Sequence, residues 1–247
     1  MKVVIITRYN EKIDWIGYII DFVDQIIIFN KGSNNDLFKD FNPPAKVIIK
    51  QLPNIGRIDH TITHYILENW DTLPDTLISL PASILMCVAK GQYLNAMRKR
   101  FDIVKERYNG YFSPRFRKVN PNTFNYTIDN YQAEGYCNRN NNPFIKSDYP
   151  DFRVWKEAII DKRPIRYIGM RGMFIVCKEN ILHIDKKIYE RLLESLSVGD
   201  NIENGHFAER IWAHLFRQYS FDVIKPNNEI KQEDGTYEMV CAIRNPY

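Results

Sequence analysis

Five polar side chains follow two apolar segments near the start of the chain, and their types suit a phosphorylated, hydroxyl-rich ligand. The apolar segments, residues 3–6 and 26–29, have the composition of buried strands. The polar residues that follow them are Arg8, Asn10, Glu11, Asn30 and Lys31. Ligands of open α/β sheets bind beyond the carboxyl ends of the strands. We therefore predict that these five residues bind a nucleotide-sugar donor.

Arg57 is a sixth candidate for donor binding, because it follows a turn predicted at residues 53–56 that opens a helix. The N–H groups at a helix start favour an anion, and an arginine can bind phosphate through two hydrogen bonds. The alternative is that Arg57 caps a neighbouring loop. His60 and His64 share one face of this helix, but the glutamate of the H-E-x-x-H zinc motif is absent. We predict core or supporting roles for both, with His60 nearer the ligand.

Glu209 is the predicted general base. On a helix predicted over residues 205–217, Glu209 shares one face with Trp212. A carboxyl group beside a large aromatic ring is partly desolvated, which favours proton transfer, and the indole ring of Trp212 offers an apolar platform to a sugar. The alternative is that Glu209 forms a structural salt bridge with Arg210 or Arg57.

The use of a metal ion stays open. Many nucleotide-sugar enzymes carry a D-x-D motif after the fourth strand, but residues 79–83 contain no acid. Asp148 and Asp151 are predicted to be turn residues. A Mn or Mg ion therefore remains a possible cofactor without an identified ligand set. The chain also lacks the G-x-S-x-G, P-loop and G-x-G-x-x-G patterns, which argues against α/β-hydrolases, P-loop proteins and classical dinucleotide-binding proteins.

Strands and helices alternate over the first 85 residues, and this order must position the candidate residues. Strands are predicted at 3–6, 26–29, 47–49 and 76–80, with helices at 13–23 and from 56 to about 70. Such an order predicts parallel pairing with right-handed crossovers.

The second half of the chain is less regular. Residues 108–168 are rich in Asn, Tyr and Pro and are predicted to be long loops with short strands. Regular structure is predicted again at a strand over 173–176, at helices over 187–196 and 205–217, and at an edge strand within 237–243.

The composition restricts the classes of protein and of partner. With 247 residues, 45% of them hydrophobic, the chain suits one α/β domain with a large core, or two small ones. A net charge of +4, from 34 basic and 30 acidic residues, does not favour nucleic acid as the main partner. We expect a single domain over residues 1–247, with a nucleotide-sugar-binding half at 1–85 and an acceptor-side half at 86–247.

Further features favour a cytoplasmic protein without a membrane span. The cysteines are far apart and form no C-x-x-C pair, which indicates reduced thiols. The first residues are predicted to form a strand rather than a signal peptide, and no apolar run approaches the ~18 residues that cross a bilayer. A basic cluster at residues 98–105 is interrupted by Phe101, Asp102 and Ile103 and is predicted to be a solvated helix face.

The candidate residues, taken together and in order, resemble a known family. The first half contributes Arg8-Tyr9-Asn10-Glu11 with Trp15, Phe29-Asn30-Lys31-Gly32, and Leu52-Pro53-Asn54-Ile55-Gly56-Arg57 with His60. The second half contributes residues 172–176 and 188–193, and Glu209-Arg210-Ile211-Trp212 with Phe216. This set is similar to the DUF3431 family, which occurs in fungi and large DNA viruses and includes viral glycosyltransferases of GT-A-like fold. The resemblance covers about residues 3–85 and 168–218.

The resemblance implies a GT-A-like, Rossmann-like fold and transfer of a sugar from a nucleotide-sugar donor to a glycan or other hydroxyl acceptor. If the protein is viral, its expected location is the host cytoplasm. Two departures concern donor and metal use: Ile58 stands where the family usually has an acid, and Pro81-Ala82 replaces a Gln-Gly pair. The alternative function is a non-catalytic carbohydrate-binding or virion structural protein on the same fold.

Overall fold

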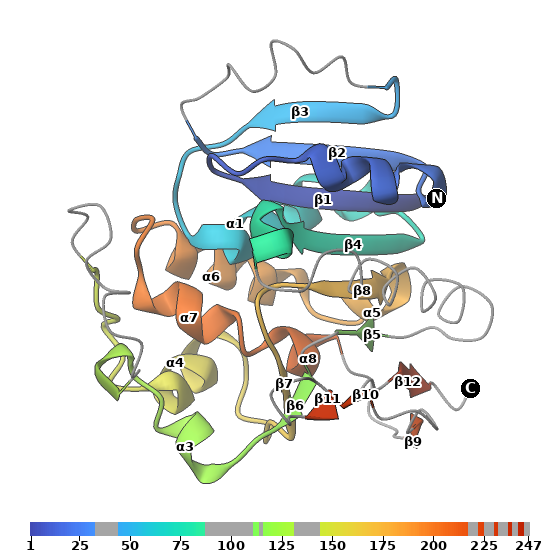
Figure 1. The fold of residues 1–247 in the computed structure, drawn as a ribbon. Coiled ribbons are helices and arrows are strands. Elements are labelled where there is room, and N and C mark those ends of the chain that lie inside the picture. Colours follow the sequence, from blue (N-terminus) through green and yellow to red (C-terminus); the bar gives the residue numbers. More distant parts are fainter. Residues whose placement is uncertain are drawn as a thin grey trace.

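Four parallel strands form one side of the central sheet in the computed structural model (Figure 1). The model describes residues 1–32, 44–86, 111–113, 116–130 and 144–216, together with short strands at 222–224, 230–231, 237–238 and 242–244. The parallel strands are β1 (Lys2–Arg8), β2 (Gln25–Asn30), β3 (Val47–Gln51) and β4 (Thr76–Pro81).

The whole sheet has the strand order β3-β2-β1-β4-β8-β5-β12-β9, in which β8 pairs antiparallel with β4. The added strands are β8 (Phe174–Cys177), β5 (Tyr111–Phe112), β12 (Ala242–Arg244) and β9 (Asp222–Ile224). Two small sheets pair β6 (Phe116–Lys118) with β7 (Tyr167–Gly169) and β10 (Ile230–Lys231) with β11 (Tyr237–Glu238). The fold is therefore mixed α/β, with a mostly parallel five-strand unit that is compatible with a Rossmann-like fold.

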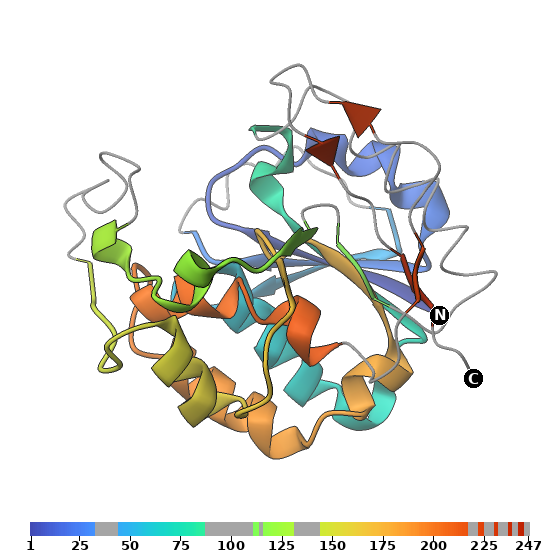
Figure 2. The same cartoon turned by 90° about the horizontal axis from the view of Figure 1, so that it is seen from below.

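Helices lie on both faces of the sheet (Figure 2). One face is covered by α1 (Arg57–Glu68), α6 (Lys186–Leu196), α7 (Glu203–Ala208) and α8 (Trp212–Leu215), with α4 (Phe152–Ile159) packed against α6 and α7. The other face is covered by the 3₁₀ helices η1 (Asp14–Tyr18), η2 (Ile20–Phe22) and η5 (Ala82–Met86). The shorter helices are η4 (Trp70–Thr72), α3 (Pro121–Phe124), η6 (Ile128–Asn130) and α5 (Lys178–Leu182).

Strand β1 shows why the sheet is buried on both faces. Val3 and Ile5 pack into the core below α1, whereas Val4 and Ile6 pack into the core below η1. Successive side chains of a strand point to opposite faces, so an uninterrupted apolar strand needs a cover on each side. The four N-terminal strands predicted from the sequence are confirmed, and so is their parallel pairing.

The prediction of one helix over residues 13–23 is wrong in its type. Two consecutive 3₁₀ helices occupy the segment, closed by hydrogen bonds from Ile16 N to Ile13 O and from Ile19 N to Ile16 O, each 2.9 Å long. Gly17 lies inside η1, and glycine is a poor former of longer helices. Trp15 is nevertheless buried, with 2% of its surface exposed.

The predicted helix over residues 205–217 is divided. Helix α7 ends at Ala208 and α8 begins at Trp212, so Glu209 lies in the link between them. Tighter hydrogen bonds, from Arg210 N to Phe207 O and from Ile211 N to Ala208 O, form this link. Side chains of the segment are buried on several sides, and tertiary packing has overridden the simple helical period.

The prediction of loops over residues 108–168 missed helix α4. Asp151 caps this helix by accepting a hydrogen bond from Val154 N at 2.9 Å, while Phe152 and Trp155 are fully buried. The role of Asp151 as a turn residue was predicted, but its effect as a helix cap was not recognised.

The C-terminal edge strand was also predicted incorrectly. Residues 237–238 and 242–244 form separate strands, and β12 lies between β5 and β9 because it pairs with both. The basic cluster at residues 98–105 lies outside the described residues. Within the described part of the chain, no helix is long and apolar enough to cross a membrane.

Candidate functional site

Arg8 and Asn30 lie together at the carboxyl ends of β1 and β2, and both side chains are fully buried. Arg8 Nη1 donates to Asn30 Oδ1 at 2.6 Å, and Arg8 Nε donates to the carbonyl of Glu11 at 2.8 Å. Asn30 Nδ2 in turn donates to Gln51 Oε1, at the end of β3, at 3.0 Å. The two predicted donor ligands thus connect the ends of three strands to one another.

Glu11 and Asn10 follow in the turn after β1. The Oε2 atom of Glu11 accepts the backbone N–H of Tyr9 at 2.7 Å and that of Asn10 at 3.2 Å. The side chain of Asn10 is exposed. Of these two predicted donor ligands, Glu11 shapes the turn and Asn10 is accessible to solvent.

Lys31 connects the end of β2 to the start of α1. Its Nζ atom donates to the carbonyl oxygens of Ile55 and Arg57, both at 2.5 Å. Burial lowers the pKa of Lys31 to about 8, and the negative charge of Asp59 opposes this shift. The ammonium group therefore holds the backbone of Arg57 beside the carboxyl ends of the parallel strands.

Arg57 extends from the first turn of α1 across helix α7. Its backbone has a φ of 55°, an uncommon value for a residue with a side chain. Gly205 leaves room for the arginine, because a Cβ atom at Gly205 would lie 2.8 Å from Arg57 Cδ. Arg57 Nη1 then lies 2.6 Å from Nε2 of His206.

His206 is the neutral partner of Arg57. A guanidinium group can only donate, so Nε2 of His206 accepts and the ring proton resides on Nδ1. Burial, with smaller contributions from the positive charges of Arg57 and Arg210, lowers the pKa of His206 to about 3. His206 was not among the candidate residues predicted from the sequence.

Asp59 is a buried acid that the sequence analysis also missed. Its side chain is 1% exposed, and Trp212 Nε1 donates to Asp59 Oδ1 at 2.7 Å. Burial, with a smaller contribution from the charge of Glu209, raises the pKa of Asp59 to about 7 against the opposing effects of the indole hydrogen bond and Arg57. A polar residue on the buried face of a predicted helix was the one signal that could have identified it.

Trp212 has a different position from the one predicted. The indole ring is 1% exposed and stacks on Phe216 with 5.4 Å between ring centroids. No face of the ring is left for a sugar, and its contribution to the site is the hydrogen bond to Asp59.

Glu209 contacts the turn between β7 and β8. One carboxylate oxygen accepts the backbone N–H of Arg171, and the other lies 3.9 Å from Arg210 Nη1. Arg171 has a φ of 67°, and its Nη1 atom is buried without a hydrogen-bond partner in the part of the chain that the structure describes. Residues held in such backbone conformations are frequent at functional sites.

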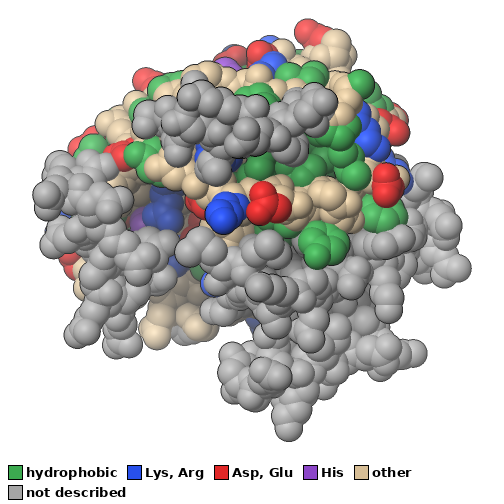
Figure 3. Space-filling view, turned by 45° about the horizontal axis from the view of Figure 1, so that its top comes forward, with side chains coloured by type: hydrophobic (Ala, Val, Ile, Leu, Met, Phe, Trp, Pro, Cys, Tyr) green, Lys and Arg blue, Asp and Glu red, His purple; other side chains and the backbone are tan. Residues whose placement is uncertain are grey.

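The same turn packs on the first turn of α1. A Cβ atom at Gly172 would lie 2.8 Å from Ile58 Cγ2, so the backbone of this turn lies directly on the residue that precedes Asp59. The structure therefore brings together two carboxyl groups, Asp59 and Glu209, and two strained arginines, Arg57 and Arg171. In the space-filling view, basic, acidic and histidine side chains are visible together in a hollow (Figure 3).

His60 and His64 stack on one another, with 6.1 Å between ring centroids and 8° between planes. Burial, with smaller contributions from Lys31 and His64, lowers the pKa of His60 to about 4. Within the described residues, no group of three His, Cys, Asp or Glu side chains is placed to hold a metal ion.

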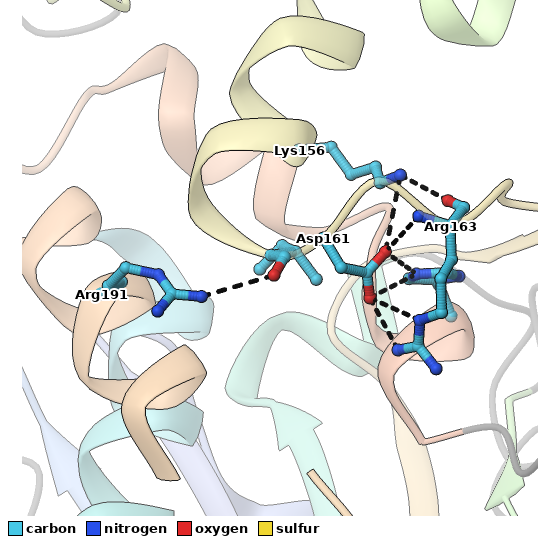
Figure 4. Close-up of polar contacts among 6 residues, drawn as sticks. Lys156, Asp161, Arg163 and Arg191 are labelled. Carbon is cyan, nitrogen blue, oxygen red and sulfur yellow. Dashed lines mark hydrogen bonds and ion pairs between the residues drawn. The ribbon is translucent and has the colours of Figure 1, made fainter. Parts of the chain in front are cut away.

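A second charged cluster surrounds Asp161 (Figure 4). Arg163 Nη2 and His214 Nε2 lie 2.6 and 3.0 Å from its carboxylate, and Lys156 Nζ lies 3.6 Å away. Burial alone would raise the pKa of Asp161, but hydrogen bonds from His214 and Arg163 outweigh it and hold the pKa well below its usual range. Arg191 caps the end of α4 by donating to the carbonyl of Ile159 at 3.0 Å. These contacts are internal and connect α4 to α8, which indicates a structural role.

Comparison with known proteins gives no assignment, because the sequence matches no protein-family model and no curated protein was found to be similar.

Proposed function

We propose that the protein is a nucleotide-sugar-dependent glycosyltransferase of GT-A-like fold, which acts on a hydroxyl group of a glycan or another acceptor. The observation that carries the proposal is the convergence of Arg57, Asp59 and Glu209 beside the carboxyl ends of parallel strands. The resemblance to the DUF3431 family supports the same function.

In the proposed reaction, Arg57 binds the diphosphate of the donor. Its positive charge stabilises the negative charge that builds on the leaving diphosphate, in place of a Mn or Mg ion or beside one. Glu209 takes the proton of the acceptor hydroxyl as that oxygen forms a bond to the anomeric carbon. The bond from this carbon to the diphosphate breaks, and the nucleoside diphosphate leaves. This sequence inverts the anomeric configuration; in a retaining reaction, Glu209 would orient the acceptor instead.

A non-catalytic carbohydrate-binding or virion structural protein is the second candidate. One observation favours it: Arg8 and Asn30, two of the predicted donor ligands, are fully buried and hydrogen-bonded to each other. A protein that kept the fold but lost donor binding would not need these two side chains to be accessible to a ligand.

A thermal-shift screen distinguishes the two candidates. The screen uses UDP, GDP, CMP and their common sugar conjugates, each with and without Mn²⁺. A ligand that binds only the folded state stabilises it by ~2.7 kcal/mol at 100 times its Kd, which is a measurable rise in Tm. A shift with one nucleotide is the expected result. The absence of a shift with every nucleotide, in folded protein, would favour the non-catalytic candidate.

The variant Glu209→Gln then tests the catalytic assignment. With the donor found in the screen, we expect turnover to fall ~100-fold or more while the Kd of the donor stays near that of the wild type, because the general base is lost. Glu190→Gln, at an exposed position of α6, is the matched control. Turnover of Glu209→Gln equal to that of the control would contradict the role of Glu209.

A further inference from the structure

Asp59 and Glu209 belong to distant segments that two sets of contacts bring together. Trp212, three residues after Glu209, donates its indole proton to Asp59 at 2.7 Å. The turn that contains Arg171 donates a backbone N–H to Glu209 and packs its next residue, Gly172, on α1 beside Asp59. The two carboxyl groups are close enough for the charge of Glu209 to raise the pKa of Asp59, and both are largely buried.

Two carboxyl groups in such a region do not ionise together, because the negative charge of the first makes loss of the second proton less favourable. The group that ionises first is the one whose charge is better stabilised by its surroundings. Glu209 is the better solvated of the two, with 18% of its side chain exposed, and it has a backbone N–H donor and the guanidinium of Arg210 at 3.9 Å. Asp59 is 1% exposed, and a neutral indole is its one side-chain hydrogen-bond donor among the described residues.

We propose that Asp59 and Glu209 form an unequal carboxyl pair, in which Asp59 keeps a proton and Glu209 carries the negative charge. Asp59 is then a positioning residue: its neutral carboxyl fixes the indole of Trp212 and leaves a single negative charge at the site. The catalytic consequence rests on the proposed transferase function, whereas the location of the proton does not.

Charged groups from several elements face Asp59. Lys31, after β2, and Arg57, on α1, favour the ionised carboxylate, and Glu209, after α7, opposes it. Burial is the largest effect and acts with Glu209 to raise the pKa of Asp59 to about 7. A second negative charge would therefore appear at the site just above neutral pH, where it repels the diphosphate of a donor.

Carbon-13 NMR of the protein labelled at Asp and Glu carboxyl carbons tests the pair without a ligand. We expect the Asp59 carboxyl to titrate with a midpoint near pH 7. Glu209→Gln removes the neighbouring charge and should lower this midpoint, whereas Trp212→Phe removes the indole donor and should raise it. Glu190→Gln should leave it unchanged. A midpoint for Asp59 below pH 5, or one that does not respond to Glu209→Gln, would overturn the proposal.

The pH profile of transfer tests the functional consequence. Above pH 7, we expect the wild-type rate to fall by roughly tenfold per pH unit, as for loss of one essential proton. Asp59→Asn keeps an oxygen acceptor for Trp212 and cannot ionise, so its rate should stay constant above pH 7 until Lys31, with a pKa of about 8, loses its proton. Asp71→Asn, at an exposed position of η4, should follow the wild type. If Asp59→Asn lowered the rate equally at every pH and kept the wild-type pH profile, Asp59 would have only a structural role. Failure of every donor to react would contradict the transferase function and leave the NMR titration to decide the pair.

Discussion

Asp59 and His206 have pKa values displaced in opposite directions, and both displacements favour the neutral side chain. Burial raises the pKa of Asp59 to about 7 and lowers that of His206 to about 3. With Asp59 protonated as proposed and His206 neutral, the charged groups of the site are Lys31, Arg57, Arg171 and Glu209. A bound phosphate would therefore interact with a guanidinium group whose orientation is fixed by a neutral imidazole.

Replacement of Arg57 by alanine separates phosphate binding from nucleoside binding. Loss of a charge-assisted hydrogen bond costs ~1.5–3 kcal/mol, so we expect the Kd of the nucleoside diphosphate to rise ~10- to 100-fold. The Kd of the nucleoside alone should change little. Calorimetric titration of both ligands measures the difference, with Arg153→Ala, at an exposed position of α4, as the control. Equal losses for both ligands would contradict a phosphate role.

At the scale of elements, the ends of helices and one turn position the site, while the strands supply the support. Arg57 begins α1, Glu209 follows the end of α7, and Arg171 lies in the turn between β7 and β8. These segments approach closely because small residues lie at their contacts. Gly205 is one such contact, since the side chain of Arg57 occupies the space beside it.

The variant Gly205→Ala tests this close approach. Alanine favours a helix by ~1 kcal/mol over glycine, so we expect the free energy of unfolding to stay the same or to rise. The added Cβ would lie 2.8 Å from Arg57 Cδ, so the side chain must move and the affinity for nucleoside diphosphate should fall. Gly17→Ala is the control, because no atom lies within 4 Å of its added Cβ. Unchanged affinity in Gly205→Ala would show that the position of Arg57 is not critical.

At the scale of the whole molecule, stability should rise with pH below neutrality. The folded-state pKa values of His60 and His206 are lowered to about 4 and about 3, so below ~6.5 the unfolded chain binds protons that the folded chain does not. Asp59 has the opposite effect on the pH dependence of stability. Because its pKa in the folded state is raised to about 7, it stabilises the folded state most at low pH, and this contribution is lost as the pH rises. The two histidines outweigh the single acid.

Urea unfolding at several pH values between 4.5 and 6.5 measures this dependence. Asp59→Asn removes the opposing contribution, so its free energy of unfolding should rise more steeply with pH than that of the wild type, by at most ~1.4 kcal/mol per unit. Asp71→Asn should remain parallel to the wild type. A slope for Asp59→Asn that is equal to or shallower than the wild-type slope would contradict the buried, protonated state of Asp59.

The strands were predictable because local sequence carries their signal. Apolar runs such as residues 3–6 and 26–29 must be covered on both faces, and short connections through helices impose parallel order. Arg57 and Glu209 were identified as candidates by their residue types and their positions near predicted helices. Helix α4 was missed because its Asp151 cap was taken for an ordinary turn residue.

The sequence by itself determined the mixed α/β class, the parallel strands and several polar residues at the strand ends. Only the tertiary structure decided which of these residues share a site. In the folded protein Arg8 donates a hydrogen bond to Asn30, and Asp59 accepts one from Trp212, which lies 153 residues away in the chain. The physical reason is that burial and charge depend on the neighbours that packing supplies, and no local pattern of residues specifies those neighbours.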